Sequence, residues 1–141
     1  MAQAAASIDI PVSPNEVWQL IGGFNSLRDW LPNIPKSELS EGGRVRHLAT
    51  LSGDTIIERL ERFDNTARAY SYSVLQAPFK IKNYLATIRV EAKDGENSSR
   101  VEWSGIFTPD GISDEEASKL FQEIFDDGLK ALAARFKSKK E

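Results

Sequence analysis

The sequence predicts an α+β fold in which a curved antiparallel sheet of about seven strands surrounds one long C-terminal helix. Two short helices are expected after the first strand. Residues 37–109 form a run of β-rich segments separated by turn signals. Residues 113–136 repeat apolar side chains at helical spacing. The helical segments lie at the ends of the strand run, which is typical of α+β proteins.

The N-terminal part is predicted as one strand followed by two short helices. The strand is expected at residues 7–12, where apolar residues alternate with smaller or polar ones. Residues 1–6 lack the charged and long apolar regions of a secretory signal, so we expect a frayed start and a cytoplasmic location. Serine, proline and glutamate in residues 13–16 form a capping box, and the glycines at 22–23 end that helix. Residues 25–31 form the second short helix.

The middle of the chain is predicted as a meander of six strands. They are expected at residues 36–39, 44–51, 55–63, 67–75, 82–91 and 100–108. Short loops between successive strands favour antiparallel neighbours. Such a sheet curls through its twist, and the long helix at 113–136 is the only element that can cover its concave side. A length of 141 residues suits one domain spanning residues 1–141.

Composition excludes several classes of site. Hydrophobic residues make up 40% and charged residues 28%, as in soluble globular proteins. No window approaches the ~18 continuous apolar residues of a membrane span. The net charge of −3 gives no basic field for nucleic acid. The absence of cysteine excludes disulfides and thiolate metal sites, and the single histidine, His47, excludes sites built on histidine pairs. Tyrosines, glutamates and arginines remain as polar groups for a pocket.

Alternation along the strands indicates which side chains face the helix. In residues 82–91 the apolar set contains Tyr84, so Tyr84 is expected to face inward. In residues 100–108 alternation by itself buries the set that contains Trp103. In residues 55–63 neither set is cleanly apolar.

Several short motifs together resemble a known family. They lie at residues 29–32, 45–48, 58–64, 70–72, 82–84 and 103–105. Their order and spacing resemble the bacterial polyketide cyclase/dehydrase and lipid-transport family, part of the START-like, Bet v 1-like (SRPBCC) superfamily with the helix-grip fold. The likeness covers residues 7–136. The middle of the chain also resembles the plant abscisic-acid receptors of the same superfamily.

The resemblance implies a cavity between the sheet and the long helix that holds a hydrophobic or amphipathic small molecule. By similarity to the receptors, the ligand-binding positions are Leu48, Thr50, Glu58, Tyr72, Tyr84, Glu102, Leu120, Ile124 and Gly128. Arg46 joins them because a guanidinium suits planar oxygen groups. The catalytic candidates are Glu58, Glu102 and Tyr84. We expect no cofactor, no metal, no nucleic acid and no integral membrane contact.

The sequence departs from the receptors at two places. The turn at residues 52–54 replaces their gating loop but is shorter and lacks its leucine-proline-alanine. Their ligand-pairing lysine falls near Pro32. Both departures argue against abscisic acid as the ligand. The resemblance also overrides alternation on the last strand, because it places Glu102 and Ser104 inside and Trp103 on the outer face.

The charged candidates admit two interpretations each. Glu58 and Glu102 are either a carboxylate pair whose pKa values differ, which suits acid/base chemistry, or they pair with arginines or water. Arg46 binds a ligand oxygen or forms a cross-strand ion pair with a glutamate. His47 is expected on the outer face if Leu48 lies inside.

Three functions follow from these interpretations. We favour a binding or carrier protein for a lipid, polyketide or aromatic metabolite, because the sequence contains no nucleophile–base set. The alternative is an aromatase/cyclase-like enzyme that uses Glu58, Glu102, Tyr72 or Tyr84 as acid/base groups. A receptor-like regulatory module is least expected, given the short turn at residues 52–54. The identity of the ligand and the oligomeric state do not follow from the sequence.

Overall fold

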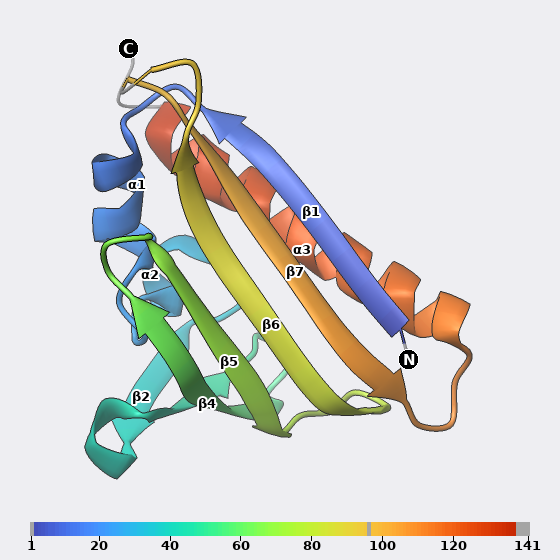
Figure 1. The fold of residues 1–141 in the computed structure, drawn as a ribbon. Helices are drawn as coiled ribbons and strands as arrows, with labels where there is room; N and C mark the ends of the chain where they lie inside the picture. Colours follow the sequence, from blue (N-terminus) through green and yellow to red (C-terminus); the bar gives the residue numbers. More distant parts are fainter. Residues whose placement is uncertain (1, 96, 138–141) are drawn as a thin grey trace.

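The computed structural model describes residues 2–95 and 97–137, which form a curved antiparallel sheet with a long helix along its inner face (Figure 1). The elements are β1 (Ala2–Ile10), α1 (Pro14–Ile21), α2 (Leu27–Trp30), β2 (Lys36–Ser40), a 3-10 turn η1 (Glu41–Gly43), β3 (Val45–Ala49), β4 (Thr55–Asp64), β5 (Ala69–Gln76), β6 (Ile81–Ala92), β7 (Ser99–Pro109) and α3 (Asp114–Lys137). The predicted α+β class and element order are confirmed.

The seven strands have the order β1-β7-β6-β5-β4-β3-β2. Strands β2 to β7 form a meander, since each pairs with its successor, and β1 pairs with β7 at the far edge. The segment with α1 and α2 therefore carries the chain from one edge of the sheet to the other. Both short helices lie beside the inner face, at the flank away from the start of α3 (Figure 1).

The expected frayed start is wrong for the described residues. Residues 2–6 belong to β1 and pair with β7, with Ala2 opposite Phe107 and Ala6 opposite Trp103. Ala2 and Ala4 are buried. An alanine-rich segment carries little β propensity of its own, and its strand conformation comes from pairing with β7 and burial under α3.

A side chain covers part of the outer edge of β1. The backbone N–H of Ala5 donates to Gln122 Oε1 at 3.2 Å, and Gln122 Nε2 donates to the Ala5 carbonyl at 2.6 Å. The amide of this α3 residue thus pairs with the strand as a neighbouring strand would. Free strand edges promote pairing with other chains, so Gln122 protects this edge.

Bulges bend the sheet around the helix. The register of β4 against β5 shifts between Ile57 and Glu58 and again between Leu60 and Arg62. The register of β6 against β7 shifts between Lys82 and Leu85, where Asn83 has a φ of 54°. Bulges bend a strand and increase its twist, so these shifts help the sheet to curve over α3.

The long helix packs its apolar stripe onto the sheet. Its capping box is formed, because the Glu116 N–H donates to Ser113 Oγ at 3.1 Å. Phe125 stacks on Trp103 with ring centroids 4.8 Å apart. Gly128 is buried where a Cβ would lie 2.7 Å from the Trp103 ring, so the helix needs glycine to approach the sheet this closely. Among the described residues, no helix is both long and apolar enough to cross a membrane.

Candidate functional site

A cavity of about 300 Å³ lies between the inner face of the sheet and α3. Its wall is mainly apolar and is rich in aromatic side chains. The lining residues are Leu27, Leu31, Pro32, Asn33, Ile34, Leu48, Thr50, Ile56, Glu58, Tyr72, Val74, Phe79, Tyr84, Trp103, Phe121, Ile124, Phe125, Asp127, Gly128 and Ala131. This volume is at the lower end of the roughly 300–1,000 Å³ of small-molecule sites. The cavity therefore has room for a compact organic ligand.

Strand alternation and a bulge place the polar groups of the wall. Tyr70 and Tyr72 both point inward because they lie two residues apart on β5. The irregularity after Lys82 precedes Tyr84, which is buried on the inner face of β6. On β4, Glu58 lies directly opposite Arg46 of β3, so the two side chains meet on the same face.

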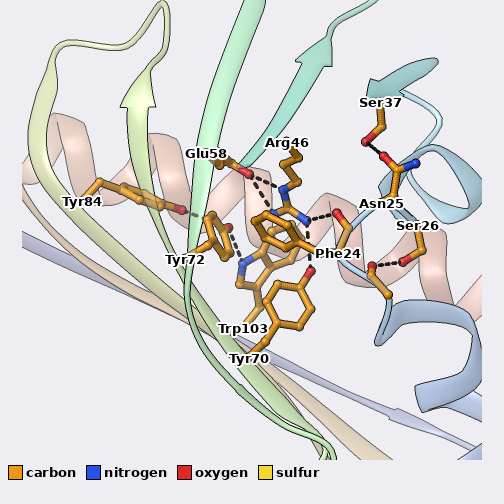
Figure 2. A network of polar contacts seen from close by, with 11 residues as sticks. Phe24, Asn25, Ser26, Ser37, Arg46, Glu58, Tyr70, Tyr72, Tyr84 and Trp103 are labelled. Atoms are coloured by element: carbon orange, nitrogen blue, oxygen red, sulfur yellow. Dashed lines mark hydrogen bonds and ion pairs between the residues drawn. The ribbon is translucent and has the colours of Figure 1, made fainter. Parts of the chain in front are cut away.

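Arg46 forms a buried ion pair with Glu58, which lines the cavity (Figure 2). Arg46 Nε and Nη2 each lie 2.8 Å from Glu58 Oε1. Arg46 Nη1 also donates to the Phe24 carbonyl at 3.2 Å and to the Tyr70 hydroxyl at 3.3 Å. The guanidinium lies over the rings of Phe24 and Tyr72, at 4.2 and 4.8 Å from their centroids. Arg46 is wholly buried, so its charge is compensated within the protein.

Three aromatic residues form a second set of hydrogen bonds along the wall. Trp103 Nε1 donates to the Tyr72 hydroxyl at 3.1 Å, and the Tyr72 and Tyr84 hydroxyls are 3.4 Å apart (Figure 2). One hydroxyl hydrogen is used between the two tyrosines, which leaves the other available to a ligand. The network thus presents both donor and acceptor capacity to the cavity.

Burial controls the ionisation of these groups. It raises the pKa of the Glu58 carboxyl above its usual range, and the Arg46 guanidinium opposes that shift. Burial also raises the pKa of Tyr72 and of Tyr84, and the neighbouring Glu58 carboxylate adds to both shifts. Both phenols therefore keep their protons at neutral pH and act as hydrogen-bonding groups rather than bases.

Seven of the ten predicted ligand-binding positions line the cavity. They are Leu48, Thr50, Glu58, Tyr72, Tyr84, Ile124 and Gly128. Arg46 lies behind the wall, in the cross-strand ion pair that was one of its two interpretations. Leu120 is half-buried against the core but is not part of the lining. His47 is on the outer side of β3, where Ser40 Oγ lies 2.9 Å from its Nε2.

The inward placement of Glu102 and Ser104 is wrong. Both are exposed, whereas Trp103 is buried and lines the cavity. Strict alternation along β7 decides the faces, since its register with β1 is continuous through these residues. The carboxylate pair of Glu58 and Glu102 does not exist, because the two side chains lie on opposite faces of the sheet.

The predicted ligand-binding positions include two of the aromatic residues of the wall, Tyr72 and Tyr84. Trp103 was marked by alternation, and Phe121 and Phe125 by their place on the apolar stripe of α3. The resemblance places Phe79 in a loop at the cavity mouth, as a lid residue or an exposed aromatic, and the structure shows it in the lining with its ring centroid 5.3 Å from that of Phe121. The described residues contain no group of three or more acidic or histidine side chains that could hold a metal ion.

Comparison with known proteins bears on the family and the fold. A family model described as polyketide cyclase/dehydrase and lipid transport matches residues 1–137. The protein XoxI from Bacillus cereus is 58% identical, with a TM-score of 0.97 over 100% of this chain and 99% of that chain. A putative uncharacterized protein from Bacillus thuringiensis is also 58% identical, with a TM-score of 0.94 over 96% and 98%.

A more distant structure shares the fold alone. A START superfamily protein from Mycobacterium smegmatis is 13% identical, with a TM-score of 0.81 over 98% of this chain and 99% of that chain. The predicted family resemblance and START-like fold are confirmed, and the description of the family is consistent with a ligand-binding role. The likeness to the plant receptors stays a prediction.

Proposed function

Because the chain belongs to the polyketide cyclase/dehydrase and lipid-transport family, we propose that it binds a hydrophobic or amphipathic small molecule in the cavity between the sheet and α3. The observation that carries the proposal is the cavity itself, which has a mainly apolar wall and a few convergent polar groups. Glu58, Tyr72 and Tyr84 supply those groups from three adjacent strands. Such a combination is typical of small-molecule sites, in which apolar area gives affinity and polar groups give orientation.

Binding is tested first on the protein as purified. Native mass spectrometry and organic extraction should recover a co-purifying small molecule, and the stripped protein should then bind the neutral dye N-phenyl-1-naphthylamine with an increase in its fluorescence. A protein that carries no molecule and takes up no neutral apolar dye would contradict the proposal.

A cavity-filling variant locates the site. Ile124 lines the cavity and is half-buried, so Ile124→Phe adds volume inside it. We expect dye affinity to fall by about tenfold or more, the loss of about 1.4 kcal/mol. Ile106→Phe is the matched control, because Ile106 is 41% exposed on the outer face of β7. Equal affinities in the two variants would place the dye elsewhere.

One observation favours catalysis as a second function. Glu58 lines the cavity and its pKa is raised by burial, as is common for general acids. Without Glu102, a cyclase-like reaction would have to use Glu58 with Tyr72 and Tyr84. In that case the extracted molecule is converted on incubation with fresh protein, and Glu58→Gln abolishes conversion while binding persists.

A further inference from the structure

The ionisable groups of the cavity wall are unbalanced. Of the described residues that line it, two are acidic, Glu58 and Asp127, and none is basic. We propose, building on the binding function above, that the cavity selects neutral aromatic molecules with a hydroxyl group and rejects carboxylates and phosphates of the same shape. An apolar cavity with only acidic charges makes desolvation of a ligand anion costly and leaves that anion unpaired.

Arg46, the nearest buried cation, is not available to a ligand. Arg46 Nε donates to Glu58 Oε1, Nη1 donates to the Phe24 carbonyl and to the Tyr70 hydroxyl, and Nη2 lies 2.8 Å from the same Glu58 oxygen in the ion pair. Its guanidinium is wholly buried and covered by the rings of Phe24 and Tyr72. A ligand carboxylate would have to displace Glu58, which would leave a buried carboxylate without its partner.

The polar wall instead favours a group that both donates and accepts. Glu58 uses Oε1 for Arg46, and nothing in residues 2–95 and 97–137 donates to Oε2. Glu58 lines the cavity, so a ligand hydroxyl can donate to that oxygen. The same hydroxyl can accept from the hydrogen that the pair Tyr72 and Tyr84 leaves free. A carboxylate offers acceptors alone and meets Glu58 with like charge.

The shape of the wall favours an aromatic ligand. Six aromatic side chains line the cavity, namely Tyr72, Phe79, Tyr84, Trp103, Phe121 and Phe125. They come from β5, β6, β7, α3 and the loop before β6, so rings surround the space from both the sheet and the helix. Offset and edge contacts with a ligand ring add to the gain from burying its apolar area. A volume of about 300 Å³ suits a molecule of naphthalene size.

The test compares three probes of one shape. Isothermal titration calorimetry at pH 7.5 measures the stripped protein with naphthalene, 2-naphthol and 2-naphthoate. We expect 2-naphthol to bind about tenfold or more tightly than 2-naphthoate, since the cavity wall holds no counter-charge. Equal or tighter binding of 2-naphthoate overturns the selectivity. If naphthalene and 2-naphthol both fail to bind, the proposed binding function fails as well, so the two failures are distinguishable.

A charge reversal at the cavity wall tests whether the lack of a positive charge causes the preference against anions. It leaves the buried ion pair of Arg46 and Glu58 in place. Asp127 is exposed and lines the cavity from α3, so Asp127→Lys supplies the missing cation. We expect the ratio of 2-naphthoate to 2-naphthol affinity to rise about threefold to tenfold, as for a partly screened charge pair. Glu123→Lys makes the same charge change at an exposed α3 position outside the lining and should alter the ratio by less than about twofold. An equal rise in both variants would mean that general charge, not the cavity, sets the preference.

Discussion

Tyr72 lies between two regions that are built in opposite ways, the buried Arg46 network and the open cavity. On one side, the Arg46 network (Phe24, Arg46, Glu58 and Tyr70) is closely packed, and the buried Arg46 guanidinium is paired with Glu58 and donates to the Phe24 carbonyl and the Tyr70 hydroxyl. On the other side, the aromatic rings around the cavity leave about 300 Å³ unfilled. Buried charge requires full pairing, whereas an apolar wall tolerates empty space at a moderate cost. We expect the closed region to stabilise the fold beside the open region, where we propose that a ligand binds.

The largest effect is expected from breaking the closed region. Arg46→Met leaves the Glu58 carboxylate buried without a partner, and we expect the free energy of unfolding to fall by about 3–5 kcal/mol. Urea unfolding followed by circular dichroism measures it. The double variant Arg46→Met with Glu58→Leu removes both charges and should recover more than half of the loss.

The matched control is an ion pair on the surface. Lys36 and Glu38 lie 3.9 Å apart with both side chains exposed, so Lys36→Met should change stability by less than about 0.5 kcal/mol. If Arg46→Met costs no more than this control, the buried network does not stabilise the fold as the geometry indicates.

The second-largest effect on stability is expected at Gly128, where α3 borders the cavity. Gly128→Ala puts a Cβ 2.7 Å from the rigid Trp103 ring and 3.1 Å from Leu31. We expect a loss of about 1–3 kcal/mol from overpacking, reduced by up to about 1 kcal/mol by the better helix propensity of alanine. Thermal unfolding measures it, and exposed Lys130→Ala in the same helix should stay within about 0.5 kcal/mol. A stabilised Gly128→Ala would show that the helix can move away from the sheet.

A smaller effect is expected at the protected edge of β1. Gln122→Glu keeps an acceptor for the Ala5 N–H but loses the donor to the Ala5 carbonyl. We expect stability to fall by about 1 kcal/mol and self-association to increase, because part of a strand edge becomes free. Analytical ultracentrifugation at several concentrations measures association. A variant that stays in its original oligomeric state would argue that α3 itself blocks the edge.

The sequence predicted the residues of the open region better than the contacts of the closed region. Alternation predicted the inward face of Tyr84, the resemblance placed Tyr72 in the cavity, and the helical period predicted the stripe that carries Phe121 and Phe125. The resemblance located Glu58 and Ile124 on the cavity wall but misplaced Glu102, where the simpler rule of alternation was right.

Other features depend on long-range contacts that local patterns do not report. The Arg46 pair was one of two open interpretations, because the register between β3 and β4 decides which residues are opposite each other. The strand at residues 2–6 depends on pairing with β7, more than ninety-five positions away. Phe79 reaches the cavity from a loop whose path is set by the strands that it joins. Periodicity within a segment does not carry that information.

The smallest effect is a pH dependence on the opposite side of the sheet from the cavity. Hydrogen bonds from Arg100 and Lys93 lower the pKa of the exposed Asp9 carboxyl from 3.8 to about 2. A carboxyl whose pKa is lower in the folded state adds stability above its unfolded pKa, and this stability is lost as pH falls toward the folded value. We therefore expect the difference in urea midpoint between wild type and Asp9→Asn to be largest above about pH 5, to fall steadily between about pH 5 and pH 2, and to disappear below about pH 2. The pKa shift of Glu58 has the opposite direction to that of Asp9. Burial raises the pKa of the Glu58 carboxyl, so its ionisation lowers the stability of the fold as the pH rises. A difference between wild type and Asp9→Asn that stays constant from pH 6 to pH 2 would show that Asp9 acts through shape or hydrogen bonding alone, and not through its charge.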